Sequence, residues 1–379
     1  MIIIGLLQVF LLCSIFQVMT EDASLPPDLR LRARGAASNA AGRFEAHGVC
    51  YEPDGWDRDE EARVLRTQVS EERPRRIISY NRSPDLPFDR SVNPYRGCEH
   101  GCVYCFARPS HAYLGLSPGL DFETRLIARP EAPARLEAEL RARSYRVAPI
   151  AIGTNTDPYQ PMEREYAITR RCLEVLSRFN HPVAVVTKGT LIERDLDILS
   201  DMAARGLAKV GVSVTTLDDR LARLLEPRAP SPARRLAVIR RLSDAGVPVR
   251  VMVSPVVPGL SDHEIEAILG AAREAGAGAA SWIMLRLPRE VSGLFQEWLA
   301  AHYPDRAGRV MNRLREMHGG KDYSADWHRR MRGEGVFARM IARRFDLAAR
   351  RTGLDAGQGD LRSDLFEVPL ARGDQMALF

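Results

Sequence analysis

The sequence predicts an α/β fold in which parallel strands form a sheet covered by helices. Three observations lead to this fold class. Short apolar runs rich in β-branched residues alternate with amphipathic segments, glycines stand where the amphipathic segments end, and the alternation repeats six times between about residues 91 and 287. Periodicity alone fits either an open doubly wound sheet or an incomplete barrel. Both arrangements place an active site at the carboxyl ends of the strands.

The individual elements follow from the local pattern. Runs that are apolar on both faces predict strands over residues 91–95, 147–153, 183–188, 208–215, 247–254 and 279–287. A spacing of 3.6 residues between apolar positions predicts helices over residues 131–143, 162–179, 191–205, 231–245 and 261–275. Capping preferences predict helix starts at Asp218 and Ser261, and helix ends at Gly206, Gly246 and Gly276.

The segments that flank the repeat differ from it in composition. We interpret the first 19 residues as an apolar leader upstream of the true start, with Met19 as an internal start site. A membrane anchor and an unusual export signal are the alternatives, although no Lys or Arg precedes Arg30 and export signals begin with basic residues. The expected organisation is a leader at 1–19, an irregular N-terminal extension at 20–87, a core at 88–290, a basic helical extension at 291–354 and a flexible tail at 355–379.

Composition and charge exclude several classes of protein. Of the 379 residues, 45% are hydrophobic and 27% are charged, which excludes a chain that is disordered throughout. Six cysteines are too few for a disulfide scaffold in a chain of this length. The net charge of +5 permits a nucleic-acid partner but does not by itself indicate one. Residues 303–351 carry 13 Lys or Arg against 6 Asp or Glu, which is also expected of a solvated helix surface.

The segment GCEHGCVYC holds Cys98, Cys102 and Cys105 directly after the first predicted strand. Three thiols within eight residues indicate a metal centre, because thiolates select iron–sulfur clusters, zinc or copper(I). Structural zinc prefers four protein ligands, and His100 or His111 could supply the fourth. Three cysteines without a fourth ligand would instead leave one iron of a cubane cluster open to substrate or cofactor.

On these residues the sequence resembles the radical S-adenosylmethionine (radical SAM) enzymes, over about residues 88–290. The carrying features are the spacing of the three cysteines and the aromatic Tyr104 before the last of them. The segments NPYRGCEHGCVYCFAR, GTNTDPYQPMERE, SPVVPGLSD and RGAASNAAGRFE resemble an uncharacterised branch related to spore photoproduct lyase, a DNA repair enzyme. The resemblance implies a partial (β/α)6 TIM-like barrel of parallel strands, with an irregular leader and a helical C-terminal extension.

The resemblance also implies the chemistry. Cys98, Cys102 and Cys105 would hold a [4Fe–4S] cluster, and S-adenosylmethionine would chelate the remaining iron. Reductive cleavage of S-adenosylmethionine would then yield a radical that abstracts hydrogen from a substrate. A one-electron reductant such as flavodoxin or ferredoxin is the implied partner, and we expect a cytoplasmic protein because an open iron site suits a reducing compartment.

Further cofactor contacts are expected by position. The lyase resemblance places a lysine like Lys188 on the cofactor carboxylate. By position, the Ser213 hydroxyl could donate to the same carboxylate and Tyr104 could flank the adenine. Each has an ordinary structural alternative: a solvated lysine, a serine bonded to backbone and a packed aromatic ring. Residues that end the second strand could bind the ribose or amino groups, or could simply form a turn. These are Asn155, Thr156 and Asp157.

The substrate and the remaining partners are less closely specified. The lyase carries a hydrogen-donor cysteine after its second strand, whereas this sequence reads GTNTD there, which puts repair of the same lesion in doubt. The lyase resemblance allows DNA as a partner. Gln375, Leu378 and Phe379 also resemble the short peptide by which bacterial replication and repair proteins bind a sliding clamp, and the alternative, which five residues favour, is a chance match or an apolar chain end that packs on its own barrel. The alternative function is a zinc-bearing, nucleic-acid-binding module without redox chemistry.

Overall fold

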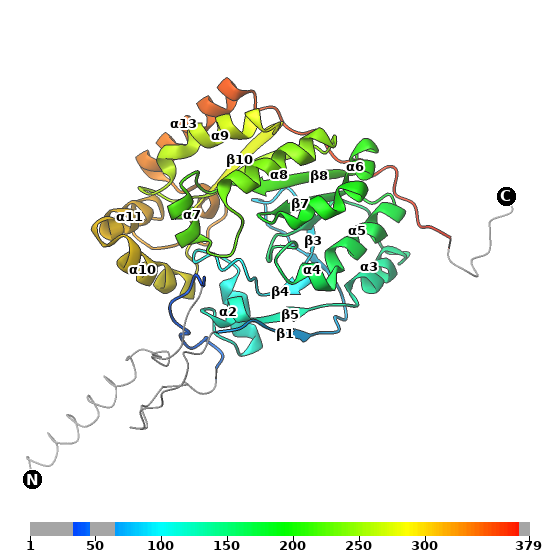
Figure 1. Ribbon diagram of the computed structural model, residues 1–379, viewed down its shortest axis with the longest axis horizontal. Coiled ribbons are helices and arrows are strands. Elements are labelled where there is room, and N and C mark those ends of the chain that lie inside the picture. The colour runs from blue at the N-terminus through cyan, green and yellow to red at the C-terminus, as the bar shows by residue number, and fades with distance from the viewer. Residues whose placement is uncertain (1–32, 46–64, 371–379) are drawn as a thin grey trace, which may run out of the picture.

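The computed structural model describes residues 33–45 and 65–370, and its centre is a seven-stranded sheet in the order β10-β9-β8-β7-β6-β3-β2 (Figure 1). All neighbours from β3 to β10 pair in parallel, and β2 joins the edge antiparallel to β3. The strands are β2 (Ile78–Tyr80), β3 (Arg90–Val92), β6 (Ile150–Ile152), β7 (Val183–Thr187), β8 (Ala208–Ser213), β9 (Val249–Val256) and β10 (Ala279–Met284). The predicted α/β fold with a parallel sheet is confirmed, and the sheet does not close on itself.

Helices connect the parallel strands and lie outside the curved sheet (Figure 1). They are α3 (Ala132–Leu140), α4 (Glu163–Tyr166), α5 (Ile168–Arg178), α6 (Leu196–Ala204), α7 (Asp219–Leu225), α8 (Pro232–Asp244) and α9 (Ile265–Glu274). Their apolar faces bury Leu136, Leu173, Leu199, Ile239 and Ile268 in one core with the outward-facing valines of the strands. Along β7 and β9 every second residue is buried against the helices, and most of the residues between them are half-buried and face the inner side of the sheet.

The observed helix boundaries refine the predicted ones. The helix predicted over 162–179 is interrupted at Ala167, whose left-handed backbone (φ 49°) separates α4 from α5. The helices predicted to begin at 191 and 261 start as the short 3-10 turns η2 (Leu191–Asp195) and η3 (Asp262–Glu264).

The predicted caps are confirmed except at Ser261. Asp218 caps α7 by accepting hydrogen bonds from the backbone N–H groups of residues 220 and 221. Gly206, Gly246 and Gly276 follow their helices with positive φ, as the sequence predicts. Ser261 stands at the N-cap position of η3, so a helical turn does start there, but its hydroxyl accepts a hydrogen bond from the N–H of Val257 and makes no capping bond.

A second, three-stranded sheet lies below the first in Figure 1. It consists of β1 (Gln68–Glu71), β5 (Arg125–Ala128) and β4 (Tyr95–Arg96), with the short segments η1 (Arg108–Leu114) and α2 (Asp121–Thr124) beside it. The N-terminal extension is therefore not irregular throughout, since β1 and β2 both fall within residues 65–87. Isolated strands of three or four residues leave too short a pattern to be recognised in a sequence.

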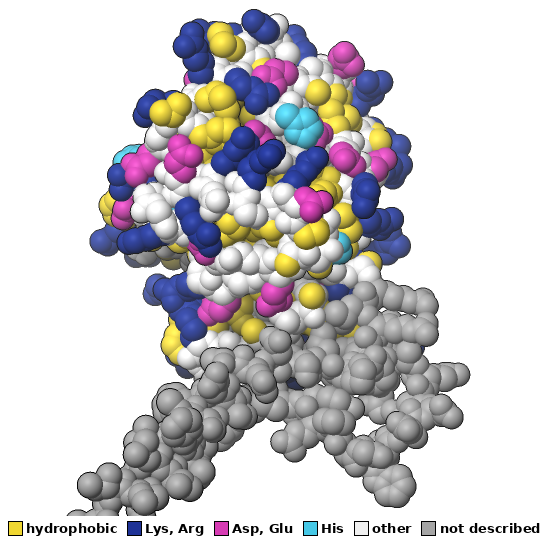
Figure 2. Space-filling view, turned by 90° about the vertical axis from the view of Figure 1, so that its left-hand side faces the viewer, with side chains coloured by type: hydrophobic (Ala, Val, Ile, Leu, Met, Phe, Trp, Pro, Cys, Tyr) yellow, Lys and Arg dark blue, Asp and Glu magenta, His cyan; other side chains and the backbone are white. Residues whose placement is uncertain are grey.

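The chain after β10 is helical, as predicted, with α10 (Glu290–His302), α11 (Pro304–Met317), α12 (Arg329–Arg332) and α13 (Gly335–Thr352). Figure 2 faces the side where α10 and α11 lie, and it shows Lys and Arg side chains interspersed with acidic and apolar ones. Among the described residues, no helix has the length and apolarity needed to cross a bilayer. The leader and the clamp-like residues Gln375, Leu378 and Phe379 lie outside the described residues.

Residues 355–370 differ from the expected flexible tail. The ring of Phe366 lies against those of Tyr145, Phe179 and His181, and the backbone N–H of Glu367 donates to the carbonyl of Phe179. This part of the tail therefore packs on the outer helices of the sheet.

Candidate active site at the carboxyl edge of the sheet

The three cysteines lie on the loop that joins β4 to η1, just beyond the carboxyl end of β3. Cys98 is buried, and Cys102 and Cys105 are half-buried. The backbone N–H of Cys98 donates to Phe122 at 2.9 Å, and that of Cys105 donates to Cys102 at 3.2 Å. Gly101 turns the loop with φ +66°, and a Cβ there would stand 2.7 Å from a carboxylate oxygen of Glu123.

Electrostatics and donor chemistry at this loop fit a bound cationic group. Burial raises the pKa of the Cys98 thiol, and Asp157 and the other two cysteines raise it further. Burial and the charge of Glu226 raise the pKa of Cys102 to about 12. Metal binding would reverse this preference, because a metal ion stabilises the thiolate form of its ligands. Three thiols on one loop are the donor set that iron–sulfur clusters or zinc prefer.

The side chains are not grouped as a ready-made metal site. Among residues 33–45 and 65–370, no three His, Cys, Asp or Glu side chains stand close enough together to hold a metal ion. His111 donates through Nε2 to the carbonyl of Arg125 at 3.0 Å, and its ring packs edge-on against Phe122. His100 faces Asp157, with 3.4 Å between Nδ1 and a carboxylate oxygen. Both histidines thus have partners other than the cysteine sulfurs.

The segment Arg34–Ala36 begins the RGAASNAAGRFE motif and supports the cysteine loop through Glu123. The backbone N–H groups of Gly35 and Ala36 each donate to the Glu123 carboxylate at 2.9 Å. Glu123 is fully buried and pairs with Arg108 at 2.5 Å, and the Nε of Arg108 donates to the carbonyl of Cys102 at 3.0 Å. A Cβ on Gly35 would overlap the carbonyl oxygen of Gly101, so only glycine fits this contact.

The loop after β6 holds the cysteine loop from the other side. The Gln160 side chain is fully buried, accepts a hydrogen bond from the N–H of Glu99 at 3.0 Å and donates to the carbonyl of Gly97 at 3.1 Å. The predicted site residue Thr156 donates to the carbonyl of Tyr95 at 3.1 Å. The sequence motif GTNTDPYQPMERE includes Gln160. It does not reveal that Gln160 fixes the cysteine loop, because the contact joins residues about 60 positions apart.

The predicted site residue Asp157 is bonded to protein groups. Its carboxylate accepts hydrogen bonds from the Thr187 hydroxyl at 2.6 Å and from the backbone N–H groups of Tyr159 at 2.9 Å and Lys188 at 2.7 Å. Burial alone would raise the pKa of Asp157, but His100 and these hydrogen bonds lower it to about 2. Asp157 therefore joins the ends of β6 and β7 as an ionised carboxylate. Asn155 beside it is half-buried.

Next to the cysteines lies a cluster of half-buried Lys188, buried Tyr104 and the unpredicted, buried Glu226. The Lys188 ammonium lies 3.9 Å from a Glu226 oxygen and 6.0 Å from the centre of the Tyr104 ring. Glu226 accepts hydrogen bonds from the Tyr104 hydroxyl, from Arg235 and, at 2.7 Å, from Thr215. Burial opposes ionisation of Glu226, yet Arg235 and Lys188 lower its pKa to about 2. Lys188 is thus held as a cation, since Glu226 and Cys102 outweigh the effect of burial on its pKa.

Two serine hydroxyl groups at the same edge, one on β8 and one on β9, lack a hydrogen-bond partner in the described structure. Lys188 and Ser213 directly follow the paired residues Thr187 and Val212, so they are neighbours at the ends of β7 and β8. No side-chain hydrogen bond satisfies Ser213, although its carbonyl accepts from Arg235 at 3.2 Å. The buried hydroxyl oxygen of Ser254 on β9 also has no partner among the described residues. Unsatisfied buried polar groups of this kind mark a place for a ligand or ordered water.

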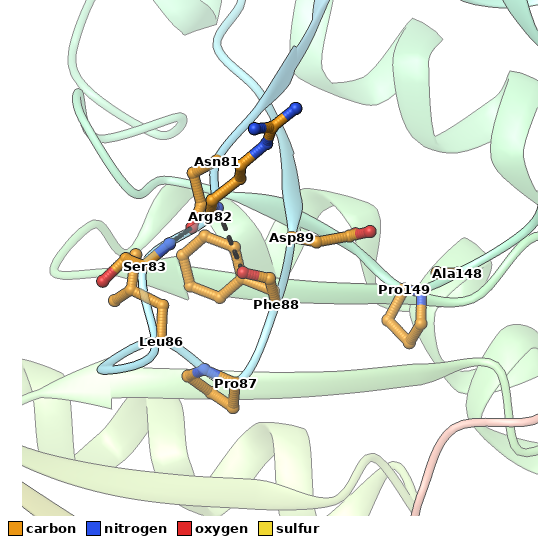
Figure 3. Close-up of a pocket in the computed structure, with 9 residues that line it drawn as sticks. All are labelled: Asn81, Arg82, Ser83, Leu86, Pro87, Phe88, Asp89, Ala148 and Pro149. Atoms are coloured by element: carbon orange, nitrogen blue, oxygen red, sulfur yellow. Dashed lines mark hydrogen bonds between the residues drawn. The ribbon is translucent and has the colours of Figure 1, made fainter.

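A separate hollow lies at the opposite end of the strands. It has a volume of about 360 Å³ and is formed by the loop that precedes β3 and by residues that precede β6 (Figure 3). Its lining comprises Asn81, Arg82, Ser83, Leu86, Pro87, Phe88, Asp89, Ala148 and Pro149. The amide of Asn81 closes the loop by donating to the carbonyl of Phe88 at 3.0 Å. The hollow is therefore not part of the cysteine site.

Comparison with known proteins agrees with this arrangement. The family model of the radical SAM superfamily matches residues 92–272. An uncharacterised protein of Mycobacterium tuberculosis strain H37Rv, Rv2578c, is 39% identical over 260 residues, which cover 68% of this chain and 75% of the relative. The radical SAM Nalpha-GlyT isomerase of Pseudomonas phage M6 is 26% identical over 175 residues, covering 46% of this chain and 34% of that protein. A solved structure of a spore photoproduct lyase variant has a similar fold, with a TM-score of 0.55 at 15% identity, covering 75% of this chain and 80% of that one.

Proposed function

Since the chain belongs to the radical SAM superfamily and is a radical SAM enzyme, we propose that Cys98, Cys102 and Cys105 hold a [4Fe–4S] cluster. The observation that carries the proposal is that all three thiols stand on one braced loop at the carboxyl edge of a parallel sheet. When bound, the cluster would supply the electron that cleaves S-adenosylmethionine to methionine and a 5′-deoxyadenosyl radical, which abstracts hydrogen from the substrate. The family favours this chemistry over the zinc-bearing module without redox activity.

The residues around the loop would bind and orient S-adenosylmethionine. Lys188 is half-buried and held as a cation, so it can pair with the cofactor carboxylate, while the Ser213 hydroxyl can donate to the same group. Glu226 would fix the position of Lys188 rather than touch the cofactor, because its oxygens are engaged by Arg235, Thr215 and Tyr104.

The remaining predicted contacts separate into two groups. The half-buried side chain of Asn155 remains a candidate for the ribose or amino groups, and the ring of Tyr104 a candidate neighbour of the adenine. Thr156 and Asp157 support the site through the backbone of neighbouring strands, since their side chains are bonded to Tyr95, Thr187 and Lys188. We propose them as residues that shape the site.

The similarity in fold to spore photoproduct lyase does not identify the substrate of this enzyme. The lyase likeness at 15% identity concerns the fold alone. The loop after β6 contains no cysteine, so a thiol at that place cannot return hydrogen to a product radical. A one-electron reductant such as flavodoxin or ferredoxin would reduce the cluster, as radical SAM chemistry requires.

Anaerobic reconstitution with iron and sulfide tests the proposed cluster. Protein loaded in this way should be brown, should contain about four irons per chain and should lose its visible absorption on exposure to air. Colourless protein that binds zinc in place of iron would contradict the proposal.

A further inference from the structure

An arginine and a phenylalanine form an exposed pair directly beside the cysteine loop. Phe106 follows Cys105 in the chain, and 44% of its surface remains exposed although its side chain is large and apolar. The guanidinium carbon of Arg286 lies 4.3 Å from the centre of the Phe106 ring. Arg286 comes two residues after the end of β10. The pair therefore connects the end of the last parallel strand to the cysteine loop.

Arg286 is half-buried and lacks an anionic partner. In residues 33–45 and 65–370, no carboxylate lies within ion-pair distance of its guanidinium, and no hydrogen bond satisfies it. Asp85, a nearby carboxylate, is already engaged by Arg330 at 2.6 Å and by the backbone N–H of His328 at 2.7 Å. None of the Arg286 nitrogens is among the buried side-chain atoms that lack a partner, so its donors remain accessible to an anion that approaches from solvent.

The stacked geometry limits the kind of anion. A guanidinium binds phosphate in a planar, bidentate manner and can stack on an aromatic ring while doing so. The exposed part of the Phe106 ring offers an apolar surface on which a second planar group can stack, in the way aromatic side chains receive nucleobases. The pair therefore presents an anion site at Arg286 and a stacking surface at Phe106, the residue that follows Cys105.

We infer that Phe106 and Arg286 bind the substrate, and that the substrate contains a nucleotide unit whose base stacks on Phe106 and whose phosphate pairs with Arg286. The inference rests on the proposed function, because it takes the cysteine loop as the place where the reaction occurs. The same nucleotide chemistry could be presented by a free nucleotide or by a single strand of nucleic acid.

Binding measurements on the anaerobically reconstituted protein test this inference and separate the two sources. The ligands are thymidine 5′-monophosphate, single-stranded dT12 and an abasic strand with the same number of phosphates, each titrated by calorimetry. Phe106→Leu should weaken binding of the base-containing ligand about tenfold and leave the abasic strand unchanged, since stacking requires a base. Arg286→Gln should weaken binding of all phosphate-containing ligands. Binding of the monophosphate by the wild type identifies a free nucleotide, and binding of dT12 alone identifies a strand.

A matched control is available on the helical extension. Arg313 lies over the ring of Phe337 with 4.6 Å between the guanidinium carbon and the ring centre. Arg313→Gln and Phe337→Leu should leave all affinities unchanged. Equal affinity of wild type and Phe106→Leu for dT12 and for the monophosphate would overturn the inference, as would wild-type protein that binds no base-containing ligand better than the abasic strand.

The same samples distinguish this inference from the proposed function. Formation of 5′-deoxyadenosine by wild-type protein, together with affinities that Phe106→Leu and Arg286→Gln do not change, refutes the nucleotide site alone. Absence of 5′-deoxyadenosine in protein that has bound iron refutes the proposed function and removes the basis of the inference.

Discussion

At the scale of single residues, Glu226 determines the electrostatics beside the cysteine loop. It is buried among two cations and two hydroxyl groups, and it keeps the positive charges of Lys188 and Arg235 compensated in a place where water is scarce. Removing one partner of such a buried pair leaves an uncompensated charge, which costs far more than the pair contributes. The site therefore depends on a residue that need not touch the cofactor.

Glu226→Gln should lower the free energy of unfolding at pH 7 by about 3–5 kcal/mol, because Arg235 would lose its buried counter-charge. The carboxyl of Glu226 has a pKa of about 2 in the folded protein against 4.5 as its ordinary value. Its stabilising contribution is thus complete above pH 4.5 and is lost as the pH falls toward 2. Urea titrations at a series of pH values should show that the free energy of unfolding falls less between pH 4.5 and pH 2 in the variant than in the wild type. Parallel profiles would exclude this role for Glu226.

Lys188→Ala should weaken binding of S-adenosylmethionine by about 1.5–3 kcal/mol, the range for hydrogen bonds to charged groups, while the cluster still assembles. Equilibrium binding to the reconstituted protein measures the change. Lys209→Ala is a suitable control, since Lys209 is half-buried near the start of β8, at the other end of the same sheet. An unchanged affinity in Lys188→Ala would assign this lysine to structure alone.

At the scale of elements, the cysteine loop is held by two segments that come from different parts of the chain. The Arg34–Ala36 segment contacts it through Glu123, and the loop after β6 contacts it through Gln160. Neither contact follows from local sequence pattern, because each depends on how the elements pack. The sequence did predict the cysteine loop and the strand ends around it, since short motifs and apolar runs are local properties. It missed β1, β2, β4 and β5, which are too short to show a period. It also missed the break at Ala167, where a left-handed residue interrupts an otherwise continuous helical pattern.

Gln160→Met keeps the volume of the side chain but leaves the N–H of Glu99 and the carbonyl of Gly97 without partners. The free energy of unfolding should fall by about 1–3 kcal/mol, the cost of such unsatisfied buried groups. Iron should also dissociate faster when a chelator is added, because the cysteine loop is less firmly held. The control Gln296→Met changes a glutamine of α10 that bonds to Ser292 and Asp322. Equal rates of iron loss from wild type and Gln160→Met would contradict the role assigned to this side chain.

At the scale of the whole molecule, the helical extension bridges the first and last strands of the open sheet. Arg330 follows β10 in the chain, yet its side chain pairs with Asp85 on the loop between β2 and β3. The sequence predicted a helical extension after β10 and a sheet of six parallel strands, because both follow from periodicity. It could not predict that the extension meets this loop, or that residues 355–370 pack against the outer helices, since such contacts arise only once the chain is folded.

The central claim is that three cysteines on one loop support radical cleavage of S-adenosylmethionine. The most direct measurement is the amount of 5′-deoxyadenosine formed when anaerobically reconstituted protein is incubated with S-adenosylmethionine and a strong reductant. Wild type and Cys172→Ala, which changes a buried cysteine of α5, should both form it. Cys102→Ala should form none, because one iron would lose its thiolate. Full formation of 5′-deoxyadenosine by Cys102→Ala would contradict the account.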